Sequence, residues 1–279
     1  MSFYISLSGL KGAQTDLTVT ANNVANVSST AFKKSRAVFG DIFASSPMQG
    51  SNSTGQGVRL LGVAQQFNQG TLETTDKTLD LALTGEGFFT VQSGPPSNAI
   101  SYTRNGAFGV DADRYAVDTT GARLMVFPTD PDTGEITSMD ASALVPLQIF
   151  TTKDNETGTD AIQLAGVAIS DTGMVSATYA DGTVQYLGSV AVANFPSQDG
   201  LRQEGDAHWT ATGKSGEATY GEGNSGQYGA IRSGTLERSN VDITEELVQM
   251  ISAQRNFQAN AKAIETASTL TQTIVNMRT

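Results

Sequence analysis

The order of apolar and polar residues predicts a helix at each end of the chain and strands between them. From Asn240 to Thr279 there is no proline and no glycine, and apolar residues recur every seven positions. A second row lies four places later, so the two rows form one narrow stripe on a helix, as in a coiled coil. The rows are Ile243, Met250, Phe257 and Ile264, and Leu247, Gln254, Ala261 and Ser268. Asp242 is a favoured N-cap residue, and Glu245 stands where a capping box has its carboxylate.

The first residues carry the same spacing. Between Ser2 and Val27, one row contains Phe3, Leu10, Leu17 and Val24, and the other contains Leu7, Gln14 and Ala21. The two terminal helices are therefore expected to pair. Both stripes are diluted by small and polar residues, so one pair buries little apolar surface against an ordering cost of ~1–2 kcal/mol per residue.

This imbalance leads to a hypothesis about assembly. We expect the two ends to fray in the monomer and to become ordered when they pack against neighbouring subunits. The residues expected to form this subunit interface are Phe3, Leu7, Leu10, Leu17, Val24, Ile243, Leu247, Met250, Phe257 and Ile264.

A connector is expected after the first helix, because Asn, Ser and Thr side chains compete for backbone hydrogen bonds and turn the chain. Its characteristic residues are Asn22, Asn23, Asn26, Phe32 and Lys33. From Ala44 to Gln56, small and polar residues with Pro47, Gly50 and Gly55 predict a flexible loop, which is the candidate hinge.

From Gly57 to about Leu236 the pattern is strand-like, with short β-branched or aromatic runs bounded by Gly, Asp and Asn. Three connectors offer the positive φ angles of tight hairpins: Asn105-Gly106, Asp171-Thr172-Gly173 and Asp181-Gly182. Residues 197–229 are rich in Gly, Ser, Thr and Glu and are expected to form a long loop with limited strand content. The expected fold is α+β: paired, coiled-coil-like terminal helices flank one mainly antiparallel β domain. The expected boundaries are 1–28 for the first helix, 29–56 for the connector and hinge, 57–238 for the β domain and 239–279 for the last helix.

Composition narrows the function. A chain of 279 residues with 38% apolar residues can bury a real core. A net charge of −11 argues against nucleic acid or an anionic membrane as partner. The chain has no cysteine, and no apolar run approaches the ~20 residues of a membrane span. Polar residues also interrupt the start, so export by an ordinary cleaved signal is not expected.

The residues that could carry chemistry do not assemble into a site in the sequence. His208 is the only histidine and stands beside Trp209, which favours a structural or solvent-exposed role. Residues 130–135 begin like a calcium loop, but the glycine comes one place early and Ala141 stands where a bidentate Glu is required, so a polar turn is expected. Gly85-Glu86-Gly87 leads into a strand rather than a phosphate-binding helix. We therefore expect no catalytic, metal or cofactor site. A β-rich secreted enzyme or carbohydrate-binding module with helical dimerisation ends is the alternative class.

Several segments together resemble the bacterial flagellar axial proteins, the rod and hook family. The terminal segments are Leu7-Ser8-Gly9-Leu10, Ala21-Asn22-Asn23-Val24-Ala25-Asn26, Phe32-Lys33, Ser239-Asn240-Val241-Asp242, Glu245-Glu246-Leu247-Val248 and Ala253-Gln254-Arg255-Asn256-Phe257. Those of the middle are Gly70-Thr71-Leu72, Leu79-Asp80-Leu81-Ala82, Gly85-Glu86-Gly87-Phe88-Phe89 and Tyr102-Thr103-Arg104-Asn105-Gly106-Ala107-Phe108. One departure is Ala31, where the family usually has Gly. The turn there is expected to be less strained, or to carry its positive φ at a neighbouring Ser or Thr.

The resemblance implies a role outside the cell, in the flagellar basal body and hook. Family members are exported unfolded by the flagellar type III apparatus without a cleaved signal, and they polymerise with their terminal helices forming an inner tube and the β domain an outer layer. The implied partners are identical copies, the distal rod, hook cap and hook–filament junction proteins, and the export apparatus, with no nucleic acid, membrane or cofactor.

Within the family, Met1-Ser2-Phe3 and residues 253–257 are most similar to the hook type. The loop between Phe43 and Gly57 is shorter than the long insert that the resemblance implies for the distal rod type. This implies a flexible joint that transmits motor torque to the filament. The alternative is the distal rod, a rigid drive shaft.

Overall fold

The computed structural model describes residues 2–42, 55–94, 98–153 and 162–277. The chain divides into two compact units. Unit 1 contains Met1–Ser28, Lys33–Phe67 and Val241–Thr279, and unit 2 contains Ser29–Phe32 and Asn68–Asn240. This division differs from the expected boundaries, because residues 33–67 group with the terminal helices rather than with a separate connector and the β domain. Of the predicted hinge loop, residues 44–54 lie outside the described residues.

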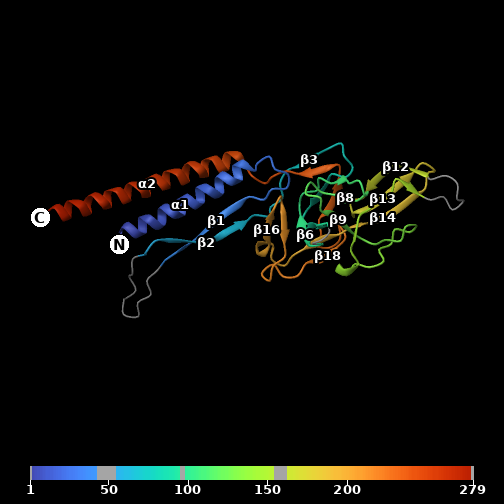
Figure 1. The fold of residues 1–279 in the computed structure, drawn as a ribbon, viewed down its shortest axis with the longest axis horizontal. Helices are drawn as coiled ribbons and strands as arrows, with labels where there is room; N and C mark the ends of the chain where they lie inside the picture. Colours follow the sequence, from blue (N-terminus) through green and yellow to red (C-terminus); the bar gives the residue numbers. More distant parts are fainter. Residues whose placement is uncertain (1, 43–54, 95–97, 154–161, 278–279) are drawn as a thin grey trace. The chain divides into compact units, whose positions relative to one another are not determined.

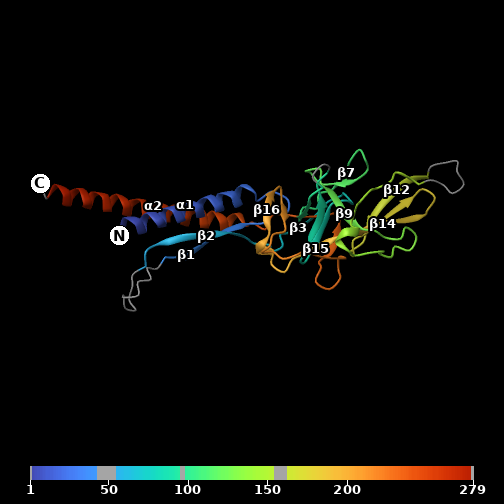
Figure 2. The same ribbon diagram turned by 60° about the horizontal axis from the view of Figure 1, so that its bottom comes forward.

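Unit 1 contains two helices and a β-hairpin. Helix α1 spans Ser2–Ala25 and helix α2 spans Ile243–Asn276, and the two run side by side in opposite directions (Figure 1). Strands β1 (Ser35–Asp41) and β2 (Val58–Gln65) pair in antiparallel fashion and pack along α1, as Figure 2 also shows. Strand β1 was not predicted from the sequence, because its partner β2 comes after the predicted loop and local patterns do not show which separated strands pair.

The ends of both helices follow local side-chain chemistry. The Asp242 carboxylate accepts hydrogen bonds from the amides of Thr244 at 2.7 Å and Glu245 at 3.2 Å, so the predicted N-cap is confirmed. At the end of α1, the side chain and the backbone amide of Asn26 both donate to the Asn22 carbonyl. The predicted helix-ending role of this Asn cluster is therefore confirmed.

Unit 2 is built on an antiparallel sheet. Its main path runs in the order β11-β12-β13-β14-β9-β5-β6-β17-β16, and every strand pair is antiparallel. Two further pairs, β19–β4 and β20–β3, join the end of the unit to its beginning. The strands are β3 (Leu72–Thr74), β4 (Leu81–Thr84), β5 (Phe88–Gln92), β6 (Ile100–Thr103), β7 (Gly109–Val110), β8 (Ala116–Val117), β9 (Arg123–Phe127), β10 (Val145–Pro146), β11 (Thr152–Lys153), β12 (Ile162–Ile169), β13 (Met174–Tyr179), β14 (Val184–Val190), β15 (Val192–Asn194), β16 (Arg202–Gly205), β17 (His208–Thr210), β18 (Thr219–Gly221), β19 (Ala230–Ser233) and β20 (Thr235–Glu237). Two terminal helices with a mostly antiparallel sheet confirm the α+β class.

The expected turns are confirmed in two cases and wrong in one. Gly173 and Gly182 have φ angles of 92° and 82°, and they close the β12–β13 and β13–β14 hairpins. Gly106 lies in the described part of the chain, and its φ is not positive. A Cβ at Gly106 would lie 1.7 Å from the Leu81 carbonyl oxygen. This glycine therefore permits a close backbone approach rather than a hairpin turn.

The core of unit 2 is closed by large side chains. Phe89 packs edge-to-face on Phe108 with 5.8 Å between ring centroids, and Phe88 packs on Trp209 at 5.7 Å. The buried cluster around Phe89 comprises Leu81, Leu83, Val91, Phe108, Ala116, Ala122, Leu124, Val126, Leu147, Ile149, Val175, Val190, Val192 and Ile231. Burial on this scale stabilises the unit by the hydrophobic effect. The predicted loop at 197–229 contributes only three short strands, β16, β17 and β18.

Candidate functional site

The two helices of unit 1 pack through a row of small and polar side chains. In α2 the buried and half-buried positions follow a spacing of three and four residues. They are Glu246, Met250, Ala253, Phe257, Asn260, Ile264 and Ala267, with Ala261 beside them. In α1 the most buried side chains are Ala13, Thr20 and Asn23. A Cβ at Gly9 would lie 2.7 Å from the Asn260 Oδ1, so the glycine lets the helices come close together.

The buried row agrees only in part with the predicted α2 stripe: Met250, Phe257, Ala261 and Ile264 belong to both. Leu247, Gln254 and Ser268 of the expected α2 stripe are exposed, as are Gln14 and Ala21 of the α1 stripe. Small residues explain the difference, because Gly9 and Ala13 let the helix backbones approach more closely than facing leucines would. Helices α1 and α2 therefore contact each other through residues only some of which the seven-residue pattern predicted.

This packing leaves apolar side chains of α2 exposed. Near its beginning, Ile243, Leu247, Val248 and Ile251 are 44–61% exposed. Gly9 lies against Asn260, and Asn23 lies against Glu246. The residues of α2 after Ala267 therefore have no α1 residue opposite them. That end carries the exposed side chains Leu270, Ile274, Val275 and Met277.

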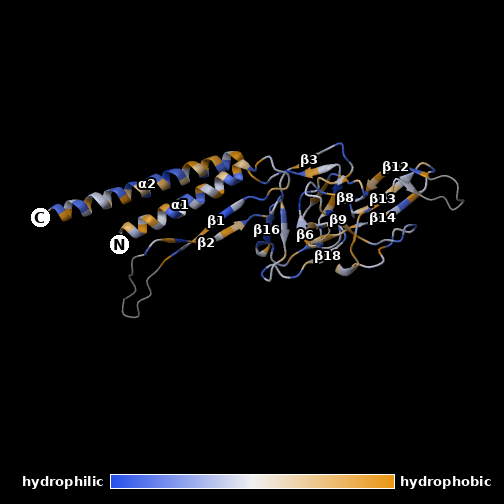
Figure 3. Cartoon of the chain, in the orientation of Figure 1, coloured by the Kyte–Doolittle hydropathy of each residue, from blue (hydrophilic) through white to orange (hydrophobic). Residues whose placement is uncertain are grey.

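The start of α1 is exposed in the same way. Phe3, Tyr4 and Ile5 have 40–74% of their surface accessible. Figure 3 shows apolar colour at the start of α1 and at both ends of α2. Exposed apolar surface of this extent is typical of a protein-interaction surface. The start of α1 and both ends of α2 therefore carry apolar surface that is exposed to solvent.

The ten expected contact residues divide into two groups. Phe3, Ile243 and Leu247 are exposed. The other seven are half-buried: Leu7, Leu10, Leu17, Val24, Met250, Phe257 and Ile264. Sequence reasoning missed Tyr4, Ile5, Val248 and Ile251, which lie beside the seven-residue rows and whose apolar character was the available signal.

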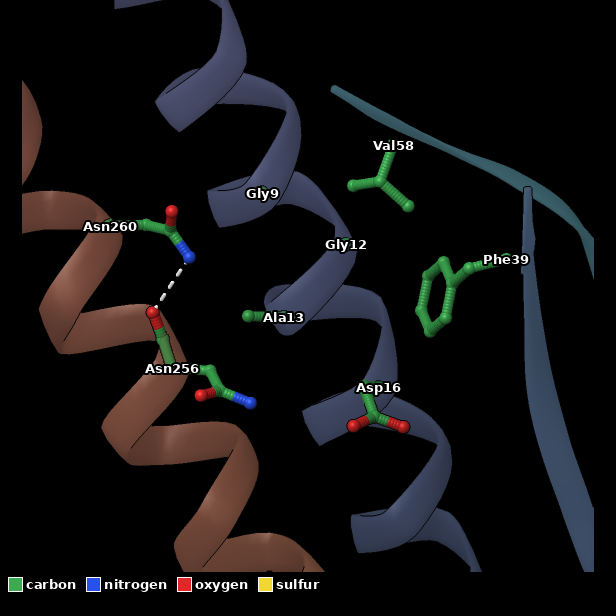
Figure 4. A pocket seen from close by; sticks show the side chains of 8 residues that line it. All are labelled: Gly9, Gly12, Ala13, Asp16, Phe39, Val58, Asn256 and Asn260. Carbon is green, nitrogen blue, oxygen red and sulfur yellow. Dashed lines mark hydrogen bonds between the residues drawn. The ribbon is translucent and has the colours of Figure 1, made fainter. Parts of the chain in front are cut away.

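A hollow of about 220 Å³ lies over α1, between α2 and the hairpin. Figure 4 shows Gly9, Gly12 and Ala13 along α1, with Asn256 and Asn260 on one side and Phe39 and Val58 on the other. Asp16 lies at one end, and burial raises the pKa of its carboxyl group. The hollow exists because the three small residues leave space that a larger side chain would fill.

Asn23 joins three segments of unit 1. Its side-chain Oδ1 accepts from the Ser35 amide at 2.9 Å, and its Nδ2 donates to the Ser35 carbonyl at 2.8 Å. The same Nδ2 donates to Glu246 Oε2 at 3.0 Å. Asn23 and Glu246 are each 2% exposed. One amide therefore fixes the end of α1 to the start of β1 and to the first turn of α2.

The remaining connector residues are placed as follows. Asn22 is exposed and provides the carbonyl that Asn26 caps. Lys33 is buried, and the Phe32 carbonyl accepts a hydrogen bond from the Asn240 amide. The turn at Ala31 was expected to be less strained or to have its positive φ at a neighbouring Ser or Thr, and this prediction is wrong. The φ of Ala31 itself is 56°, so the strain falls on the alanine. Its amide donates to the Glu237 carbonyl at 2.8 Å, which holds this conformation.

His208 is buried and has a structural partner. Its Nε2 lies 2.7 Å from Asp118 Oδ2, and its Nδ1 lies 2.9 Å from the Asp206 carbonyl. Because both ring nitrogens face acceptors, the doubly protonated imidazolium satisfies both contacts. Burial alone would lower the pKa of His208, but the hydrogen bond and charge of Asp118, helped by Asp206, raise it. Burial would raise the pKa of Asp118, but hydrogen bonds from His208, Thr120 and the Ala122 amide lower it.

The calcium-like loop is a polar turn, as expected. Asp130 Oδ1 accepts from the Asp132 amide at 3.0 Å, and the Asp130 carbonyl accepts from Gly134. Among the described residues, no group of three or more His, Asp or Glu side chains is placed to hold a metal ion. Neither described helix is long and apolar enough to cross a membrane.

Three family models of flagellar proteins match parts of this chain. Residues 3–33 match the family model "Flagella basal body rod protein", residues 82–177 match "Flagellar hook protein FlgE/F/G D1 domain", and residues 232–277 match "Flagellar basal body rod FlgEFG protein C-terminal". The chain is 33% identical to the flagellar basal-body rod protein FlgG of Bacillus subtilis (strain 168), over 99% of this chain and 98% of that protein. It is 26% identical to the flagellar hook protein FlgE of Escherichia coli (strain K12) and 28% identical to that of Salmonella typhimurium, over the whole length of both chains.

The matched family models all describe structural proteins of the flagellar axis. The chain belongs to the family of flagellar hook and rod proteins. It is a structural flagellar protein of the hook and rod type, not an enzyme.

Proposed function

We propose that this chain is the subunit of the tubular flagellar hook, a flexible joint that passes motor torque to the filament. The observation that carries the proposal is the apolar surface left exposed on α1 and α2. Covering it with identical copies would remove apolar side chains from water. Contacts between different faces of successive copies do not close, so they generate a tube that can grow without limit.

In this proposal the helices form the inner layer of the tube through coiled-coil-like contacts between copies, and unit 2 forms the outer layer. The ten residues expected from the sequence, together with Tyr4, Ile5, Val248 and Ile251, form the contacts between copies. The distal rod, the hook cap and the hook–filament junction proteins are the proposed neighbours. Export through the type III apparatus brings the subunit outside the cell.

The hook is favoured over the rod by features of the sequence. The start Met1-Ser2-Phe3 and the stretch 253–257 resemble the hook type, and the loop between Phe43 and Gly57 is shorter than the insert that the resemblance implies for the distal rod. One observation favours the distal rod as second candidate. The relative from Bacillus subtilis named as a rod protein aligns over 289 residues at 33% identity, whereas the Escherichia coli hook protein aligns over 410 residues at 26%. The rod reading thus needs fewer gaps.

Assembly is tested by concentrating purified protein and imaging it by negative-stain electron microscopy. We expect tubes from the native chain. The Leu247→Ser variant removes an exposed side chain, so it should stay folded by circular dichroism and form few tubes. Ser252→Ala, at an exposed polar position of the same helix, is the control and should assemble like the native chain. Small particles from the native chain at every concentration would contradict the proposal.

Hook and rod are distinguished in cells that lack this chain. Basal bodies purified from the deletion strain should retain a complete distal rod and lack only the hook. Loss of the distal rod as well would favour the second candidate.

A further inference from the structure

Unit 2 contains three segments that lead directly into unit 1. The chain passes between the units at residues 28/29, 32/33, 67/68 and 240/241. The adjoining parts of unit 2 are therefore residues 29–32, 68–71 and 237–240. Any force passing along the chain between the units enters unit 2 through these three segments.

Hydrogen bonds tie the three segments to one another. The Ala31 amide donates to the Glu237 carbonyl at 2.8 Å, and the Arg238 amide donates to the Thr71 carbonyl at 2.8 Å. The Asn240 side chain donates to the Asn68 carbonyl at 3.0 Å, and the Asn240 amide donates to the Phe32 carbonyl at 3.3 Å. Each segment is thus bonded to a segment that is distant in sequence.

A buried carboxylate lies at the centre of these contacts. Glu237 is fully buried, and its Oε1 accepts from the Gly70 amide at 2.8 Å. Its Oε2 lies 3.5 Å from Arg104 Nη1. A buried charge is costly unless its partners stay in place. Moving residue 70 or residue 237 away would therefore leave a charge without its partner inside the protein.

Arg104 connects this carboxylate to the core of unit 2. The arginine is 2% exposed, and its guanidinium carbon lies 5.3 Å from the centre of the Phe88 ring. Burial lowers the pKa of Arg104, while the negative charges of Glu237 and Glu86 oppose that shift. Phe88 in turn packs on Trp209 and Phe195. The path from the three segments thus ends on the aromatic core.

The backbones at this point are pressed close together. A Cβ at Gly70 would lie 2.0 Å from the Arg238 carbonyl oxygen, so no other residue fits without moving the chain. Ala31 is fully buried and has a positive φ of 56°. Both features show that the surrounding contacts determine the conformation of these segments.

We propose that Glu237 is a positioning residue that locks these three segments together, so that torque entering through any of them is shared and reaches the core through Arg104. The residues Ala31, Gly70, Arg104, Glu237 and Asn240 form this junction cluster. The inference rests on the proposed function, since it assigns the cluster a role in passing torque along the assembled tube. A pair that serves stability alone would not affect how stiffly an assembled tube resists twisting.

The test compares Glu237→Gln with Glu73→Gln. The Gln variant keeps the size of the side chain but removes the charge that faces Arg104. Glu73 forms an exposed pair with Arg238 across the same β3–β20 ladder, which makes it a matched control. Hydrogen exchange on the monomer measures protection of the Ala31 and Gly70 amides. We expect both to exchange at least tenfold faster in Glu237→Gln and to be unchanged in Glu73→Gln.

The second readout is torsional stiffness. In cells tethered by a flagellum, the elastic recoil after the motor stops measures how stiffly the joint resists twisting. We expect hooks built from Glu237→Gln to be at least twofold softer, with Glu73→Gln equal to the native chain. Unchanged stiffness with faster amide exchange would overturn the proposal and leave the pair a stabilising contact alone.

Two further outcomes are informative. If Glu237→Gln does not assemble, Arg104→Lys replaces it, because lysine keeps the charge but loses the planar fork. Native stiffness in Arg104→Lys hooks, with faster exchange at Ala31 and Gly70, would also overturn the proposal. If the native monomer forms no tubes, the proposed function fails. The junction cluster can still be tested on the monomer in that case. If the Ala31 and Gly70 amides do not change their exchange rates together in Glu237→Gln, the claim that Glu237 locks these segments together is refuted.

Discussion

The two units of this chain bury their apolar residues to very different degrees. In unit 2, Phe88, Phe89 and Leu124 are at most 1% exposed. In unit 1, the α2 side chains Val248, Leu270 and Ile274 are 61–65% exposed. Apolar side chains are therefore present in both units, but unit 2 encloses a core of large ones, whereas α2 leaves many of its large apolar side chains exposed.

The difference shows how stability is distributed along the chain. Unit 2 contains a closed core, which is what an independently folding domain needs. The helices of unit 1 pack through small residues and polar contacts and leave apolar side chains exposed. Under the proposed function, their free energy of folding would depend more on neighbouring copies, and the helices would become ordered where those copies are present.

The largest expected effect sets a core residue of unit 2 against a helix residue of unit 1. Phe89→Ala removes a buried ring and should lower the free energy of unfolding by about 3–5 kcal/mol. Leu247→Ala shortens an exposed side chain and should change it by about 0.5 kcal/mol or less in the monomer. Urea unfolding followed by the fluorescence of Trp209 for unit 2 and by circular dichroism for the helices measures both. An equal loss of unfolding free energy in the two variants would contradict the claim that only unit 2 depends on these side chains in the monomer.

The next effect concerns the polar contacts of unit 1. Asn23→Ala removes the bonds to Ser35 and Glu246, leaving buried groups without partners, and should cost about 2–3 kcal/mol. The helical signal should melt earlier while the Trp209 transition stays in place. Asn22→Ala, at the exposed neighbouring position, is the control and should cost about 0.5 kcal/mol or less. If Asn23→Ala shifts both transitions equally, the units are not energetically separate.

A smaller effect depends on pH and belongs to unit 2. The folded-state pKa of His208 is raised, so its contact with Asp118 stabilises fully below the unfolded pKa of about 6.5 and is lost as pH rises through the folded value. The pKa of Asp118 is lowered, so its contribution is present above about pH 4 and is lost as pH falls through its folded value. The His208–Asp118 pair therefore contributes most to the stability of unit 2 between about pH 4 and about pH 6.5.

Denaturation at pH 6 and at pH 9 checks this. The native unit 2 should lose stability towards pH 9, and His208→Gln should lose less over the same range because it has no proton to release. A variant and native chain with parallel pH dependence would show that the imidazolium is not the stabilising form.

The smallest effect tests the strained turn. Ala31→Gly removes the penalty of a positive φ but adds freedom to the unfolded chain, so we expect a gain of about 0.5–1 kcal/mol. Ser28→Gly, in the same turn region at an exposed site without a positive φ, should not stabilise. A loss of stability in Ala31→Gly would mean that the buried methyl group matters more than the backbone strain.

The sequence predicts some of these features well and others poorly, for physical reasons. Asp242 and the Asn cluster act on nearby backbone groups, so local reasoning found the helix ends. Strands β12, β13 and β14 form hairpins with adjacent partners, and Gly173 and Gly182 have the positive φ angles predicted for the turns between them. Strand β1 pairs with β2 across the predicted loop, and that partner cannot be inferred from local patterns.

The helix–helix contact was harder to predict. A seven-residue pattern identifies where apolar residues recur, but Gly9 and Ala13 determine which side of α1 can approach α2. Likewise, Arg104 lies in a segment that resembles the family, but its pairing with Glu237 depends on tertiary structure and could not be predicted from the sequence. The packing of α1 on α2 and the Glu237–Arg104 pair thus depend on tertiary contacts that sequence patterns do not show, whereas most of the apolar residues proposed to join copies were predicted from the sequence.

Residue-resolved hydrogen exchange on dilute monomer and on assembled tubes tests the central claim most directly. We expect the α2 amides from Ala261 to Asn276 to exchange rapidly in the monomer and at least a hundredfold more slowly in tubes, while the amides of β5 and β9 are equally protected in both. Strong protection of α2 in the monomer, unchanged on assembly, would contradict the claim that neighbouring copies complete this unit.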